Sequence, residues 1–167
     1  LNYVTMRDGT ELAMTVRLPG GKDISDGPFP TFVEYSGYQT AAPHDAFASF
    51  ITNTSDPLAP ATSTAVGSIV GPLLNFATVS VQMRGSGCSG GGFDLFGLPT
   101  TFDGYDAVET VGNQSWVKNG KVGMGGISFS GITQLFTAGT QPPHLAAVAP
   151  MSVTDDVYTA TGYPGGI

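Results

Sequence analysis

The chain has 167 residues, 41% of them hydrophobic, which is enough for one domain with a sizeable core. Thirteen acidic residues outweigh six Lys and Arg, and the net charge of -7 disfavours nucleic acid or an anionic membrane as a partner. One cysteine, Cys88, excludes an intrachain disulfide, and two distant histidines, His44 and His144, show no metal-ligand spacing, so neither a metal nor a cofactor is expected. The compartment stays open: few lysines and two Asn-x-Ser triplets, at Asn53 and Asn113, favour secretion only weakly.

The first part of the chain is expected to open with an antiparallel hairpin. Residues 3–6 and 12–18 have the character of short strands, and Asp8-Gly9 between them is a strong turn signal. Residues 31–35 follow a Pro- and Gly-rich loop and predict a third strand, rich in β-branched and aromatic side chains. The apolar spacing within 64–76 suits a helix, although two glycines and a proline oppose it.

The second part of the chain alternates strands and helices. A buried strand over 77–81 leads into a glycine-rich loop, and later strands are expected at 122–125 and 145–149. Helices are expected at 103–111 and 129–138. A hairpin followed by this alternation predicts an α/β fold, with a mostly parallel sheet flanked by helices.

One turn in this second part has the pattern of a nucleophile. Residues 122–131 run from a strand through small residues into a helix, with Ser128 at the turn. A serine strained in a left-handed conformation there needs small neighbours two positions away, and Gly126 and Ser130 are small. The backbone N–H of Phe129 could then stabilise the oxyanion formed when Ser128 attacks a carbonyl. Gly131 would let the helix pack close to the neighbouring strand.

Other interpretations of the local motifs remain open. Ser128 could be an idle serine in a glycine-softened connection, and Ser130 is a rival nucleophile one turn into the helix. Gly85–Gly90 matches the dinucleotide-binding pattern Gly-x-Gly-x-x-Gly, but the residues that follow are poor helix formers. A tight loop with Arg84 held by a carboxylate is the simpler interpretation. Cys88 is expected to be an inert thiol.

Several segments in order resemble the cocaine esterase and X-prolyl dipeptidyl-peptidase family of α/β-hydrolases. The segments are Met6–Leu12, Pro30–Tyr38, Arg84–Gly91, Asp103–Glu109 with Trp116, Asn119–Ser128, and Pro142–Leu145 with Ala149-Pro150. The resemblance implies that Ser128 is the nucleophile and that the Tyr38 hydroxyl completes the oxyanion hole beside the Phe129 N–H. Gly37 stands where a proline is common in the family.

The resemblance also implies that a base and an acid are missing. The order in this fold is Ser, then Asp or Glu, then His, and the 39 residues after Ser128 cannot complete it. His144 and His44 are weak candidates for the base, and Asp155 and Asp156 are expected to be caps or solvated carboxylates. We therefore expect 1–167 to be the N-terminal part of a catalytic domain, with a cap insertion beginning near 155–167.

Two functions follow as hypotheses. The first is a serine hydrolase that cleaves a small ester or a short X-Pro peptide through an acyl-enzyme on Ser128. The alternative is a non-catalytic binding or scaffold module on the same fold. In both cases the remaining C-terminal part, or a second chain, is expected to cover an open sheet edge and exposed apolar surface.

Overall fold

The structure is a computed structural model that describes residues 2–38, 71 and 73–166. These residues form one six-stranded sheet in the order β1-β2-β4-β3-β5-β6. The pairs β3–β4, β3–β5 and β5–β6 are parallel, and the pairs β1–β2 and β2–β4 are antiparallel. The strands are β1 (Asn2–Thr5), β2 (Glu11–Arg17), β3 (Phe29–Ser36), β4 (Ala77–Gln82), β5 (Val117–Ile127) and β6 (Leu145–Met151). The expected α/β fold with an antiparallel N-terminal hairpin is confirmed.

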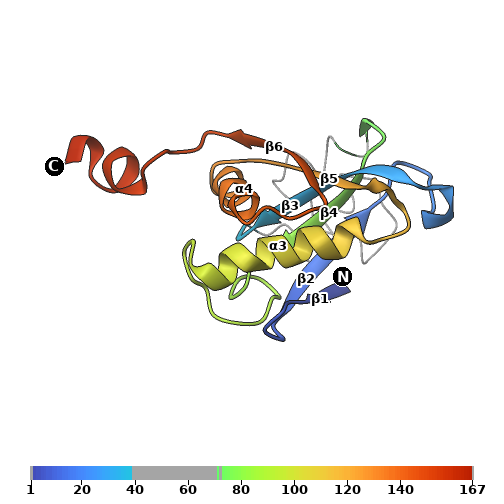
Figure 1. Cartoon of the computed structure of the whole chain (residues 1–167), viewed down its shortest axis with the longest axis horizontal. Helices are drawn as coiled ribbons and strands as arrows, with labels where there is room; N and C mark the ends of the chain where they lie inside the picture. The colour runs from blue at the N-terminus through green and yellow to red at the C-terminus, as the bar shows by residue number, and fades with distance from the viewer. Residues whose placement is uncertain (1, 39–70, 72, 167) are drawn as a thin grey trace, which may run out of the picture.

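Two helices cover one face of this sheet. Figure 1 shows α3 (Leu98–Gly112) and α4 (Phe129–Gly139) lying side by side across the strands. Val33 and Tyr35 alternate along β3 and are buried, and β4 is buried along its whole length, as expected for a central strand. The buried face of α3 contributes Ala107, Val108 and Val111 to the same core.

The hairpin forms where the turn signal predicts it. The Met6 N–H donates to the Thr10 carbonyl at 2.8 Å, and Gly9 adopts a φ of 84°, which a residue without a β-carbon reaches at no steric cost. β1 and β2 therefore pair from Asn2 to Thr5 in antiparallel register.

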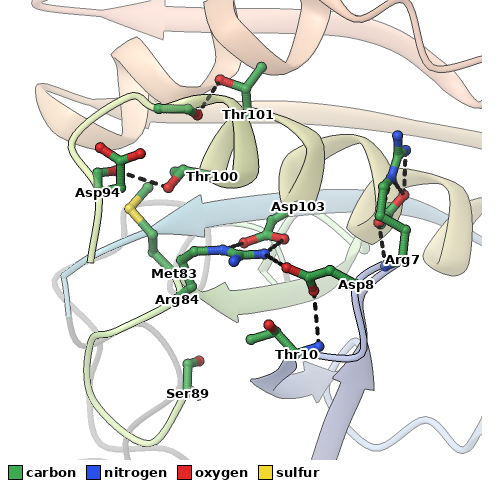
Figure 2. Close-up of polar contacts among 12 residues, drawn as sticks. Arg7, Asp8, Thr10, Met83, Arg84, Ser89, Asp94, Thr100, Thr101 and Asp103 are labelled. Carbon is green, nitrogen blue, oxygen red and sulfur yellow. Dashed lines mark hydrogen bonds and ion pairs between the residues drawn. The ribbon is translucent and has the colours of Figure 1, made fainter. Parts of the chain in front are cut away.

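Helix α3 begins earlier than the expected range 103–111. Pro99 occupies its first turn, where backbone N–H groups have no intrahelical acceptor, so the N–H that proline lacks is not needed. The Thr100 and Thr101 hydroxyls donate to the carbonyls of Asp94 and Gly97 and hold that turn (Figure 2). β5 is also longer than the expected 122–125, because its first residues continue from Trp116, whose carbonyl accepts the Phe29 N–H.

One edge of the described sheet is uncovered. β6 is the last strand in the order, and most of its residues are half or fully exposed, as are Ile127 and Leu135 beside it. Beyond β6 the chain leads away from the sheet in Figure 1. The helix expected over 64–76 lies largely outside the described residues. Among those described, no helix is both long and apolar enough to cross a membrane.

Candidate active site

Ser128 lies at a sharp bend between β5 and α4. β5 ends at Ile127 and α4 begins at Phe129, so Ser128 alone makes the connection. Its φ of 60° and ψ of -120° are unusual for a residue with a β-carbon and cost on the order of 1–3 kcal/mol. The residue is exposed. The bend therefore presents a hydroxyl at the carboxyl end of a central parallel strand.

The neighbours of Ser128 leave no room for larger side chains. A β-carbon on Gly126 would collide with the Ser130 hydroxyl. A β-carbon on Gly131 would lie 2.7 Å from the Met151 carbonyl oxygen and 2.8 Å from a Val153 methyl carbon. Small residues at these positions thus let β5, α4 and the end of β6 approach closely. The close approach expected for Gly131 is confirmed.

Two hydrogen-bond donors lie beside the Ser128 hydroxyl. The Tyr38 hydroxyl is 3.4 Å from Ser128 Oγ, a distance longer than a well-formed O–H···O bond. The Phe129 N–H is the first of α4, and it donates to no acceptor among the described residues. Ser36, which our sequence reasoning missed, holds Tyr38: its Oγ accepts the Tyr38 N–H at 3.0 Å.

Buried polar side chains fix α4 against the sheet. The Thr133 hydroxyl donates to the Tyr35 carbonyl at 2.7 Å. The Gln134 carboxamide oxygen accepts the Ala149 N–H of β6 at 3.0 Å, and its nitrogen donates to the Ser130 carbonyl at 2.8 Å. These bonds tie α4, the helix that follows Ser128, to the two strands β3 and β6. Nothing in the local sequence marks Gln134 for this role, because its partner is on another element.

The glycine-rich loop after β4 is held by an ion pair rather than built for a phosphate. The Arg84 guanidinium donates to both carboxylate oxygens of Asp103 at 2.6 Å and to Asp8 at 2.9 Å (Figure 2). These hydrogen bonds raise the pKa of Arg84, so the guanidinium stays charged. The Gly85 and Gly90 N–H groups donate to backbone carbonyls, and the next helix starts only at Leu98. The arrangement lacks the helix that a dinucleotide site requires at its last glycine.

Neither Ser130, the rival nucleophile, nor Cys88, the expected inert thiol, shares the position of Ser128 at the bend. Ser130 is buried in α4, and its hydroxyl donates to the Ile127 carbonyl at 3.0 Å. Cys88 is an exposed thiol on the glycine-rich loop, on a different element from the bend. The groups of three or more His, Cys, Asp or Glu that a metal would need do not occur in the described part of the chain.

His144 lies far from Ser128. It precedes β6, whereas Ser128 follows β5, and because these neighbouring strands are parallel the two residues lie at opposite ends of the strands, roughly 20 Å apart for strands of this length. His144 Nδ1 lies 2.7 Å from a Glu109 carboxylate oxygen, so the ring ties β6 to α3. His44 lies outside the described residues. Asp155 is exposed, and Asp156 accepts bonds from the Tyr158 N–H and the Thr159 hydroxyl, as a cap does.

Comparisons with known proteins agree with this geometry. The sequence model of the X-Pro dipeptidyl-peptidase (S15) family matches residues 8–167. The chain is 33% identical to the cocaine esterase of Rhodococcus sp. (strain MB1 Bresler) over 167 residues, covering 98% of this chain and 25% of the esterase. It thus spans about a quarter of the length of that relative.

Solved structures show the same likeness. A CocE/NonD family hydrolase from Staphylococcus aureus superposes with a TM-score of 0.73 at 28% identity, covering 95% of this chain and 28% of that one. An aminopeptidase from the marine sediment archaeon Thaumarchaeota archaeon shares the fold, with a TM-score of 0.70 at 22% identity over 95% of this chain and 27% of that one.

A mixed sheet covered by helices, with a strained serine between a central strand and a helix, defines an α/β-hydrolase. Within that class, the chain belongs to the X-Pro dipeptidyl-peptidase (S15) family of hydrolases, which confirms the resemblance seen in the sequence.

Proposed function

We propose that this chain carries the nucleophile of a serine hydrolase. Ser128 attacks an ester or amide carbonyl, an acyl-enzyme forms as the alcohol or amine leaves, and water releases the acid. The observation that carries the proposal is the bend at Ser128, which exposes a hydroxyl beside two donors. The names of the relatives, an esterase and a dipeptidyl-peptidase family, suggest small esters or short X-Pro peptides as substrates.

The oxyanion hole in this proposal consists of the Phe129 N–H and the Tyr38 hydroxyl. As the carbonyl becomes tetrahedral its oxygen gains negative charge, and the N–H at the start of α4 together with the helix dipole stabilises it. Tyr38 supplies a second donor from the end of β3. Each such donor contributes about 3–4 kcal/mol of transition-state stabilisation in serine hydrolases.

The base and the acid in this proposal come from residues beyond the 167 of this chain. The only histidine among the described residues is His144, and its ring faces Glu109 at the end of the strands opposite Ser128. The proposal therefore describes the complete protein, in which this chain is the N-terminal part of the catalytic domain. We also propose that the cap insertion begins near 155–167.

A covalent probe tests the nucleophile directly. In the complete protein, a fluorophosphonate should label Ser128, as located by peptide mass spectrometry. Ser128→Ala should abolish the label and lower ester turnover by at least 1,000-fold, in line with the loss of a triad serine. Ser130→Ala is the matched control and should keep the label. Labelling that survives Ser128→Ala would overturn the assignment, and a protein that is never labelled would favour the non-catalytic module.

A further inference from the structure

Four phenylalanine rings form a cluster that includes Phe129, the residue after Ser128, and the proposed chemistry uses only the backbone of Phe129. We name Phe93, Phe96, Phe129 and Phe136 the aromatic wall. The Phe96 ring stacks on Phe129 and on Phe136, with centroids 5.1 and 5.0 Å apart, and the Phe93 ring lies 6.4 Å from Phe129. Two of these residues come from the loop after β4 and two from α4, so segments distant in sequence build one surface.

Through Phe129, the aromatic wall adjoins Ser128 and Tyr38. Phe129 directly follows Ser128, and its ring centroid is 5.8 Å from that of Tyr38. A β-carbon on Gly37 would lie 3.3 Å from the Phe129 ring and 3.8 Å from the Phe93 ring. Because Gly37 has no side chain, both rings can lie close to the residue before Tyr38.

The loop that carries Phe93 and Phe96 is firmly held. A β-carbon on Gly85 would collide with the Phe93 backbone, so the two ends of the glycine-rich loop are in contact. Phe96 adopts a φ of 56°, an uncommon value for a residue with a bulky side chain. Arg84, at the start of the loop, is fixed by its bonds to Asp103. A wall mounted this way is organised before any ligand arrives.

The aromatic wall is nevertheless open to solvent. The Phe93 side chain is 54% exposed and that of Phe136 is 40% exposed. An apolar surface of this kind next to a reactive group usually marks a binding site. Phe129 contributes its ring to the wall and its N–H to the proposed oxyanion hole, so a ligand group that lies on the wall also lies near the reacting carbonyl. The surface fits a small ligand that enters with its ester or amide.

We propose that the aromatic wall is a specificity subsite that receives a flat apolar group of the substrate, attached on the acyl side or on the alcohol side of the scissile bond. Stacking on Phe93, which is the most exposed ring, provides the selectivity for a phenyl group over a methyl group. The inference rests on the proposed function of Ser128 and names the substrate class of that site.

Three esters test the subsite in the complete protein. Methyl benzoate against methyl acetate reports the acyl side, and benzyl acetate against methyl acetate reports the alcohol side. Phe93→Ala should lower the phenyl-to-methyl ratio of kcat/KM by about fivefold to tenfold in one of the two series, the size expected for a lost aromatic contact. Phe93→Leu, which keeps apolar bulk without a flat face, should lower it less and serves if Phe93→Ala does not fold.

Phe102→Ala is the matched control. Phe102 is a 38% exposed phenylalanine on α3, but its ring packs under the Arg7 guanidinium, 4.5 Å away, and lies outside the aromatic wall. Its substitution should leave both ratios unchanged. Ratios that stay constant in both Phe93 variants, or fall equally in Phe102→Ala, would overturn the subsite. If the wild type hydrolyses no ester and Ser128 is not labelled, the proposed function itself has failed.

Discussion

Glu34 is a carboxyl group buried in the middle of the sheet. It lies on β3 and is only 2% exposed, and its Oε2 atom has no hydrogen-bond partner among the described residues. Its register partner on β4 is Ser80, which in turn pairs with Thr15 of β2, another buried residue, whose hydroxyl makes no hydrogen bond within the described part of the chain. Burial raises the pKa of Glu34 to about 7, so the acid is neutral in mildly acidic solution.

Glu34 should make stability depend on pH. Because the pKa of its folded state lies above its ordinary value of 4.5, the folded protein holds the proton more tightly than the unfolded chain. The contribution of Glu34 to stability is therefore fully present below about pH 4.5 and is lost as pH rises to about 7, a change of at most about 3 kcal/mol. Glu34→Gln should flatten this decline between pH 5 and 8, as measured by urea unfolding. Glu11→Gln, at an exposed carboxylate, is the control, and parallel curves for Glu34→Gln and wild type would contradict the prediction.

Asp103 and Asp106 provide a matched pair of acids on α3. Asp103 is buried against Arg84, whereas Asp106 pairs with Arg7, whose side chain is 47% exposed. Asp103→Asn leaves the buried Arg84 guanidinium with only the more exposed Asp8 as counter-charge and should destabilise the fold by about 3 kcal/mol. Asp106→Asn should cost at most about 1 kcal/mol. Thermal unfolding of both variants checks this, and equal losses of stability would show that burial does not determine how much an ion pair contributes to stability.

Helices α3 and α4 approach each other through a glycine. A β-carbon on Gly104 would collide with the Thr137 hydroxyl of α4, which is buried. Gly104→Ala should therefore cost about 1–3 kcal/mol of stability despite the better helix propensity of alanine. Gly139→Ala, at the end of α4 with open space around it, should be neutral or slightly stabilising. The unfolding midpoints of the two variants give the comparison, and similar shifts would show that the helices can separate at no cost.

Elements with a local signal could be predicted from the sequence. The Asp8-Gly9 turn, the β-branched strands and the small residues around Ser128 each fix the backbone over a few positions. The start of α3 was misplaced because Pro99 fits a first helical turn, whereas residues 98–102 carry little apolar periodicity. The contacts between Gln134 and Ala149, or between Phe96 and Phe136, join distant segments or different elements. Periodicity carries no information about such contacts, so the aromatic wall could not be predicted.

The sheet formed by the described residues is uncovered at the β6 edge. β6 is an open edge, and Ile127 and Met151, at the end of the sheet where Ser128 lies, are 45% and 44% exposed. Relatives of about four times this length have room for further elements on this edge and over this surface. The position of Ser128 at that border means that any missing base must approach from the same uncovered side.

The 167 residues expressed alone should therefore be a poor catalyst with an exposed apolar surface that promotes association. Without a base, Ser128 should react with a fluorophosphonate at least 1,000-fold more slowly than in the complete protein. The open β6 edge and the exposed apolar side chains should bind a hydrophobic dye and promote association. Labelling rates and dye fluorescence measured on both preparations test this, with Ser128→Ala as the blank for labelling. A fragment that is labelled as fast as the complete protein would show that the base lies within these residues, and His44 would then be the candidate.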